Sequence, residues 1–479
     1  MMSVRPFHFR LSMPGVSGSS LAARPRMIRH LLVALNIVIA CASPSYLLAQ
    51  TDTVPTRHIG FGDAVRIALR QNLTVREAEN ATALSAVTVQ QQRNQFLPNL
   101  SLSTNTSGNI GQSFNQTAGR LVNQTSQTLN AGVSSNVTLF NGFQNLSLLR
   151  QARFGESASA AELARARQTV VFTVASNFLS LVTLQEQQGV QEENQRAQQA
   201  TLDQVQLLVT AGRRSVADLY QQQAAVASAQ SALVAARRAV ELAKVDLIQT
   251  LQLDPGGHYE FPPPSVDSTA VAPRFTLDGL LASAFKERAD LTAARTRVES
   301  ANEALRTSSA NRWPAIALTL GYNSGYTSLT EESFAAQLNQ RKGGSVGLQF
   351  SVPLFDRGIS NVASQQAAIA VANMKLSNDR QTQTVALEVR RAFLDYQAAL
   401  EQINATRAQQ RASDLALTAV QERYRVGAAT LVELSVARAA QVTAASALVN
   451  ARFNLIFQQS LMSYYTGTLD PARVSFGSV

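Results

Sequence analysis

The stretches VGAATLVEL at residues 426–434 and AGRRSVADL at residues 211–219 share one pattern in this chain of 479 residues. In each, a glycine is followed six positions later by an acid and then by a leucine. Glycine adopts the left-handed conformation that ends a helix without steric cost, and an acid in the first turn of the next helix faces the positive end of its dipole. Each stretch therefore predicts a turn between two helices. Their recurrence indicates an internal repeat.

The repeat extends over most of the chain. Five pairs of residues lie 215 or 216 positions apart: Asp63 and Asp278, Pro98 and Pro314, Leu139 and Leu354, Gly212 and Gly427, and Ser231 and Ser446. Self-similarity at one fixed offset indicates a duplicated architecture. We predict the order helix, strand, strand, long helix, turn, helix, twice over. The first repeat and its linker would occupy residues 50–265, and the second repeat residues 266–479.

The helices are predicted from apolar periodicity and from the positions of prolines. One helix is expected from about residue 59 to residue 96, because Pro98 ends it. Proline-free segments predict two more helices at 145–208 and 215–253. At 1.5 Å per residue, the first of these would span roughly 95 Å.

The first 49 residues are predicted to be an export signal. A basic segment precedes the apolar run 31–40, which is too short for a good spanning helix. Residues 1–26 are interpreted as an extension of the basic region or as the result of a start at Met27. Cys41, the only cysteine, matches a bacterial lipoprotein signal, so it is either lipidated or, the alternative we favour, lost on cleavage after residue 49. No later apolar window reaches the roughly 18 residues of a transmembrane helix.

Alternating segments predict the strands. In residues 129–140, 316–326 and 346–354, apolar residues alternate with polar or small ones. Such segments are typical of an outer-membrane barrel, although a water-soluble sheet with one buried face gives the same pattern. The export signal and the polar loops expected at 105–128 and 323–344 favour the membrane interpretation. Four strands cannot close a barrel alone, because the narrowest spanning barrels have about eight, so several copies of the chain are expected to assemble.

Composition argues against several classes of function. Aromatic residues make up 6% of the chain and charged residues 15%, which suits long helices packed through small side chains. Half of the net charge of +10 lies in the first 49 residues and the rest is scattered, so nucleic-acid binding is not expected. The single cysteine excludes an intrachain disulfide and a cysteine-based zinc site. With only His58 and His258 beyond the signal, we expect no metal site, no cofactor and no enzymatic activity.

Five short segments lie at the predicted strand-to-helix junctions, at the second turn and in the last helix. They are, in order, Leu139-Phe140-Asn141-Gly142, Leu354-Phe355-Asp356-Arg357-Gly358, Tyr424-Arg425-Val426-Gly427, Asn450-Ala451-Arg452-Phe453-Asn454 and Thr466-Gly467-Thr468-Leu469. With these segments, the chain from about residue 59 to residue 469 resembles the TolC-like outer membrane factor family. The resemblance implies a homotrimer in which each chain gives four strands to one 12-stranded barrel in outer-membrane lipid. The helices would form a long α-helical barrel that extends into the periplasm.

The family's function follows from the same resemblance. It implies a passive exit duct of a tripartite efflux pump or type I secretion system. Substrates would arrive from a periplasmic adaptor (membrane fusion) protein and an inner-membrane transporter of the RND, ABC or MFS type. The alternative is a secreted or surface coiled-coil filament protein, which would share the composition and the long helices but would not need two strand pairs.

The resemblance also implies a periplasmic gate at the two turns. Glu433 matches a ring of acidic side chains that would favour cations, whereas Val436 stands where the family pattern has a second acid. The alternative is that Glu433 only caps a solvated helix start. Asp218 and Tyr424 match a hydrogen-bonded pair that holds the gate closed, but Ala429 replaces an arginine that strengthens this link. We therefore expect a weaker closure.

The outer surface of the turns is implied to be the docking site for the adaptor. Four residues of the turns fall on this surface: Gly212, Arg213, Val426 and Gly427. The gate and the docking site would thus share the same two short segments of the chain.

Overall fold

The computed structural model describes residues 56–115, 119–263 and 274–470. The predicted export signal, with Cys41, lies outside these residues, and so does the boundary between the repeats near residue 265. Both therefore stay predictions.

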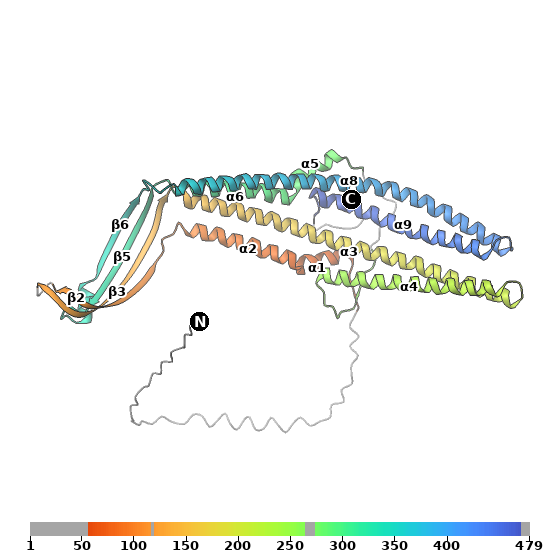
Figure 1. Cartoon of the computed structure of the whole chain (residues 1–479), viewed down its shortest axis with the longest axis horizontal. Coiled ribbons are helices and arrows are strands. Elements are labelled where there is room, and N and C mark those ends of the chain that lie inside the picture. The colour runs from red at the N-terminus through yellow and green to blue at the C-terminus, as the bar shows by residue number, and fades with distance from the viewer. Residues whose placement is uncertain (1–55, 116–118, 264–273, 471–479) are drawn as a thin grey trace, which may run out of the picture. The chain divides into compact units, whose positions relative to one another are not determined.

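The described elements occur twice in the same order (Figure 1). The first set is α1 (Phe61–Gln71), α2 (Leu73–Asn94), β2 (Ser101–Asn115), β3 (Arg120–Asn141), α3 (Gln144–Thr210) and α4 (Val216–Leu251). The second set is α5 (Leu277–Glu287), α6 (Ala289–Ala310), β5 (Ala315–Thr327), β6 (Gly343–Ser351), α8 (Ile359–Arg425) and α9 (Leu431–Thr466). Corresponding helices have equal lengths of 11, 22, 67 and 36 residues, which confirms the internal duplication.

Three short elements are additions to this order. β1 (Arg57–His58) pairs in parallel with β4 (Tyr259–Glu260), and α7 (Phe334–Gln340) lies between β5 and β6. The β1–β4 pair ties the start of the described chain to the segment that follows α4.

Two predicted elements differ from the structure. The single helix expected over residues 59–96 is broken at Asn72, whose extended backbone ends α1 and whose side chain accepts a hydrogen bond from the N–H of Thr74 at 3.0 Å to cap α2. The stretch 105–128, expected as a loop, lies largely within β2 and β3 because these strands form one continuous antiparallel ladder. Cross-strand pairing therefore overrides the low strand propensity of a polar sequence.

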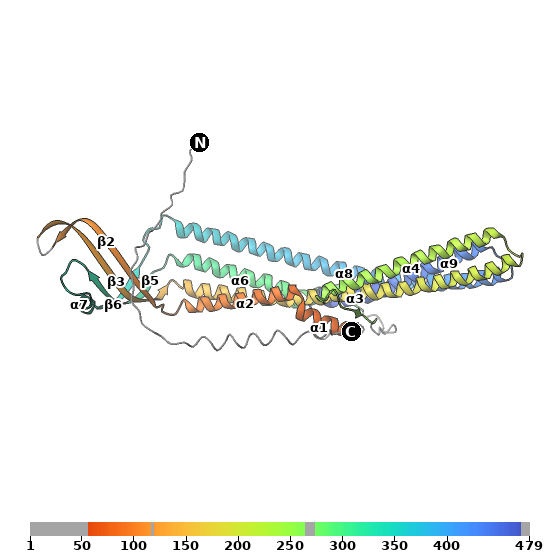
Figure 2. The same ribbon diagram turned by 90° about the horizontal axis from the view of Figure 1, so that it is seen from below.

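The four longer strands form one antiparallel sheet in the order β2-β3-β5-β6, at the end of the helices opposite the two turns (Figures 1 and 2). Residues directly opposite each other on antiparallel neighbours share a face of the sheet. Leu318 lies opposite Val137 on one side and Leu348 on the other, so apolar side chains form a row across the sheet. Leu348 is 68% exposed. The sheet thus presents an exposed apolar face, and among the described residues one edge of β2 and one edge of β6 are unpaired.

A glycine determines the junction between β3 and α3. Gly142 has a φ of +65°, and a Cβ atom at this position would lie 2.5 Å from the carbonyl oxygen of Ala310 and 2.6 Å from the Cβ of Trp313. Only glycine satisfies both the backbone conformation and the close approach. Beside it, the rings of Phe140 and Phe143 pack edge to face with centroids 5.2 Å apart. The Leu-Phe-Asn-Gly segment therefore fixes the direction in which the helix leaves the sheet.

The helices bury their apolar residues in separate clusters. In the first cluster, Phe178 of α3 is fully buried and packs edge to face against Phe61 and Phe261, with ring centroids 5.5 and 6.3 Å away. A second cluster includes Leu291 of α6 and Tyr396 of α8. Among the described helices, none is both long and apolar enough to cross a membrane.

A buried ion network lies beside the second cluster. Arg288 is 2% exposed and donates hydrogen bonds to Asp290 at 3.0 and 2.5 Å and to Glu388 at 2.7 Å. Arg165 of α3 lies 4.0 Å from the Asp290 carboxylate and 4.0 Å from the ring centroid of Tyr464. Burial acts to raise the pKa of Asp290, but the hydrogen bonds and charge of Arg288 outweigh it and hold this pKa below its ordinary value. The network connects the first repeat with α6, α8 and α9 of the second.

Candidate functional site

The two predicted turns, residues 211–215 and 426–430, lie side by side at one end of the helices and together form the tip (Figures 1 and 2). Gly212 and Gly427 have φ angles of +70° and +80°. In both turns the N–H of the residue after the glycine donates to the carbonyl five positions earlier, at 2.8 and 2.7 Å. A left-handed glycine with this hydrogen bond is a Schellman motif. The prediction that glycine ends each long helix is confirmed.

The helices that follow the turns are capped in the same way. The Ser215 hydroxyl accepts a hydrogen bond from the N–H of Asp218 at 3.1 Å, and the Thr430 hydroxyl accepts one from the N–H of Glu433 at 3.2 Å. The Glu433 carboxylate in turn accepts from the N–H of Thr430 at 3.3 Å, which completes a capping box. Both acids therefore lie in the first turn of a helix, where the sequence placed them.

Glu433 also has a counter-charge within its own chain. The guanidinium of Arg423 lies 3.2 Å from the Glu433 carboxylate and donates to the carbonyl oxygen of Ala428 at 3.0 Å. The two side chains are 55% and 43% exposed, so water screens the pair. Glu433 therefore caps the start of α9, which was the alternative role considered for it. Its place in an acidic ring stays a prediction. Arg423 was not predicted as a site residue, because the glycine predicts the turn but not which side chain of α8 the turn brings close to Glu433.

Tyr424 lies at the end of α8 and is only 5% exposed, in an apolar cluster with Val205 and Leu431. Its hydroxyl has no hydrogen-bond partner among the described residues. The hydrogen bond to Asp218 that the resemblance implies is therefore not formed within this chain, because the ring is turned into the cluster. The guanidinium carbon of Arg214 lies 4.7 Å from the ring centroid instead. Burial raises the pKa of Tyr424, with Asp218 acting in the same direction and Arg214 against it.

The remaining predicted residues occupy contrasting positions at the tip. Ala429 is buried in the same cluster as Tyr424, whereas Val436 is exposed on α9. Arg213 and Val426 are exposed, as a docking surface requires. The docking role itself stays a prediction.

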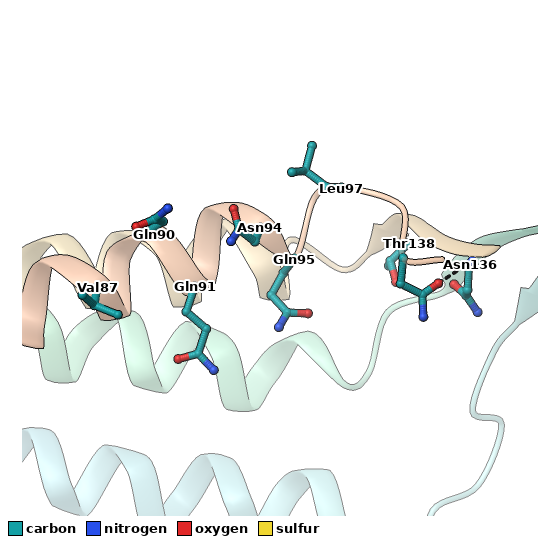
Figure 3. Close-up of a pocket in the computed structure, with 9 residues that line it drawn as sticks. Val87, Gln90, Gln91, Asn94, Gln95, Leu97, Asn136 and Thr138 are labelled. Carbon is teal, nitrogen blue, oxygen red and sulfur yellow. Dashed lines mark hydrogen bonds between the residues drawn. The ribbon is translucent and has the colours of Figure 1, made fainter. Parts of the chain in front are cut away.

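A polar cavity of about 550 Å³ lies near the sheet, where the end of α2 meets β3 (Figure 3). Its walls carry mainly amide side chains, among them Gln90, Gln91, Asn94 and Gln95. The backbone N–H of Asn136 at its edge donates to Asn99 at 2.7 Å. No lining residue is an acid, a base or a thiol, so the cavity offers no group for proton transfer. Nowhere in the described chain do three His, Cys, Asp or Glu residues gather as a metal site would require.

An open sheet with an exposed apolar face, continued by paired helices of up to 67 residues and a capped tip, defines one subunit of an outer-membrane channel. The chain belongs to the outer membrane efflux protein family, whose model matches residues 64–251 and 280–463.

Among curated relatives, the chain is similar to outer membrane protein TolC of Escherichia coli (strain K12), with 23% identity over 316 residues that cover 64% of this chain and 62% of that protein. It is also similar to TolC of Salmonella enteritidis, with 27% identity over 197 residues and 40% of each chain. The matched part thus spans less than two thirds of either TolC protein. Outer membrane efflux protein BepC of Brucella suis biovar 1 (strain 1330) is 22% identical over 343 residues, which cover 71% of this chain and 72% of BepC.

Solved structures share the fold. Outer membrane protein VceC of Vibrio cholerae superposes with a TM-score of 0.72 at 18% identity, covering 85% of this chain and 96% of VceC. The open state of the MtrE outer membrane channel of Neisseria gonorrhoeae gives a TM-score of 0.69 at 20% identity, covering 85% of this chain and 88% of MtrE. The predicted family and fold are confirmed.

Proposed function

We propose that three copies of this chain form the passive outer-membrane exit duct of a tripartite efflux pump or type I secretion system. The observation that carries the proposal is the open four-stranded sheet with its exposed apolar face. Family membership supports the same function and disfavours the alternative of a filament protein.

The sheet needs partner strands if it lies in lipid. Backbone N–H and C=O groups within a membrane must be hydrogen-bonded inside the protein, because no water is available there. Pairing β2 of one copy with β6 of the next satisfies both open edges. Three copies with four strands each close a 12-stranded barrel, within the range of about 8 to 26 strands known for such barrels. The row through Leu318 and Leu348 then faces the acyl chains.

The helices need partners as well. Apolar side chains on α4 are more than half exposed in the single chain: Val216, Val234, Leu242 and Val245. A helix that exposes such residues is stabilised by packing against another helix. In the proposed assembly, neighbouring copies cover them and the helices enclose a tunnel. Each 67-residue helix would reach about 100 Å into the periplasm.

The tip is then the periplasmic aperture of the duct. Three Glu433 side chains would line it, each beside its own Arg423. This counter-charge would make the ring a weaker attractor of cations than three unpaired carboxylates. The exposed turns around the aperture would contact a periplasmic adaptor protein, which links the duct to an inner-membrane transporter that supplies the energy.

In-cell photo-cross-linking tests the proposal. A photoreactive residue at Val426 or Arg213 should capture a second, periplasmic protein, identified by mass spectrometry as an adaptor. The matched control is Trp313, which is also exposed but lies at the opposite end of the helices. A photoreactive residue at Val234 should cross-link copies of the chain to each other. Tip positions that capture no more protein than Trp313 would contradict the adaptor, and absent cross-links at Val234 would contradict the assembly.

A further inference from the structure

The two turns of the tip belong to different repeats, more than 200 residues apart in the chain. Val205 and Leu219 of the first hairpin meet Leu431 and Leu434 of the second in the small apolar cluster around Tyr424. Further along the hairpins, the buried Arg438 guanidinium donates a hydrogen bond to the Thr201 hydroxyl at 3.2 Å. A contact that starts from the first turn itself would fix the two turns at the same height at the aperture.

Arg214 makes this contact. It extends from the first turn, is half-buried, and places its guanidinium carbon 4.7 Å from the ring centroid of Tyr424 in the second hairpin. A guanidinium at this distance over an aromatic face is attracted to the negative charge of the ring. The Tyr424 hydroxyl takes no part, since it is buried and has no hydrogen-bond partner among the described residues.

We propose that Arg214 is a gating residue of the proposed duct. Its stacking on Tyr424 fastens the first turn to the second hairpin, and this contact holds the aperture in its narrow state. Arg214 therefore takes over, from the opposite turn, the part that an arginine at position 429 would play. Ala429 leaves the tip without a cation in the second turn, and the cation in the first turn reaches the same tyrosine. The proposal rests on the proposed function, because gating requires the assembled duct.

The contact is strong enough to measure. A cation–π pair changes an equilibrium by about twofold when exposed and by about thirtyfold when shielded from water. Arg214 lies between these limits. Removing it should therefore raise the ratio of open to closed states by about two- to thirtyfold for each chain, and the effect of three chains multiplies.

Single-channel recording of the purified full-length protein in planar lipid bilayers tests the proposal. Arg214→Ala should raise the open fraction and the mean conductance, and Arg214→Lys should give an intermediate value. The matched control is Arg411→Ala, which removes the same charge from an exposed position on α8 that belongs to neither the gate nor the docking surface. Its conductance should equal that of the wild type.

Tyr424→Phe distinguishes ring stacking from a hydroxyl hydrogen bond. The variant keeps the aromatic face and loses only the hydroxyl, so its open fraction should stay at the wild-type value. Opening in Tyr424→Phe would overturn the proposal, and so would equal conductance of Arg214→Ala and Arg411→Ala. If Arg214→Ala fails to assemble, Arg214→Lys and Tyr424→Phe still decide the question. A wild-type protein that forms no channel would instead refute the proposed duct.

Discussion

Removal of the buried Arg288 guanidinium should loosen the centre of the helical region. In the variant Arg288→Met, a side chain of similar length stays in place, but Asp290 loses two hydrogen bonds and Glu388 loses one. Removing one member of a buried ion pair typically costs about 3–5 kcal/mol. Asp290 keeps Arg165 at 4.0 Å and the Gln381 amide at 3.0 Å, so the lower end applies.

The second carboxylate adds little to this cost. The side chain of Glu388 is 38% exposed, and water screens it after the loss of its partner. We therefore expect a loss of about 3 kcal/mol in local stability. Because 1.36 kcal/mol corresponds to a factor of ten, local opening should become more frequent on the order of a hundredfold.

Native-state hydrogen exchange with mass spectrometry measures this change in the assembled protein. The backbone N–H groups to follow are those of Arg288 and Thr292, which are bonded at 3.1 and 3.2 Å across the junction of α5 and α6. The matched control is Lys286→Met, because Lys286 pairs with Glu287 at the surface and its removal should change exchange less than about fivefold. Wild-type protection in Arg288→Met, or equal deprotection in the control, would refute the assignment of a stabilising network.

Three further outcomes follow from the local geometry. Arg288 lowers the pKa of Asp290, so this carboxylate stabilises the protein above about pH 4 and loses its contribution as the pH falls through the lowered pKa. Asp290→Asn should therefore flatten the fall of the urea unfolding midpoint between about pH 5 and pH 2. An unchanged slope would count against the ion pair. Gly142→Ala should lower the temperature at which the assembly dissociates. Gly155→Ala should not, because nothing lies within 4 Å of the new Cβ there. Equal dissociation temperatures would mean that the junction of β3 and α3 is not tightly packed. Arg423→Gln should raise the ratio of cation to anion permeability, and Glu433→Gln should lower this ratio. Reversal potentials in a salt gradient measure it. The absence of both shifts would place the pair away from the aperture.

The local sequence determines those features of the fold that depend on neighbouring residues. Gly212 and Gly427 predict the turns, because no other residue adopts the left-handed conformation at so little cost. The break at Asn72 is equally local, since asparagine is a preferred helix N-cap, but apolar periodicity continues through it. The extent of β2 and β3 depends on cross-strand pairing, which a polar sequence does not reveal.

The tip shows the corresponding limit for the candidate site. Position matching finds Tyr424, Asp218 and Glu433, but it cannot tell which side chains they contact. The partners observed, Arg214 and Arg423, are set by how the turns fold back and pack against each other. Ala429, considered alone, predicts a weaker closure of the gate. The contact of Arg214 with the Tyr424 ring links the two turns in another way, which matching single positions to the family does not reveal.

The assembly of three chains is tested most directly by native mass spectrometry of the protein extracted from outer membranes in mild detergent. The open edges of β2 and β6 require further copies of the chain, and the proposed 12-stranded barrel predicts a single species with three times the mass of the mature chain. A monomer, or a closed assembly with another number of chains, would contradict the duct proposed for this protein.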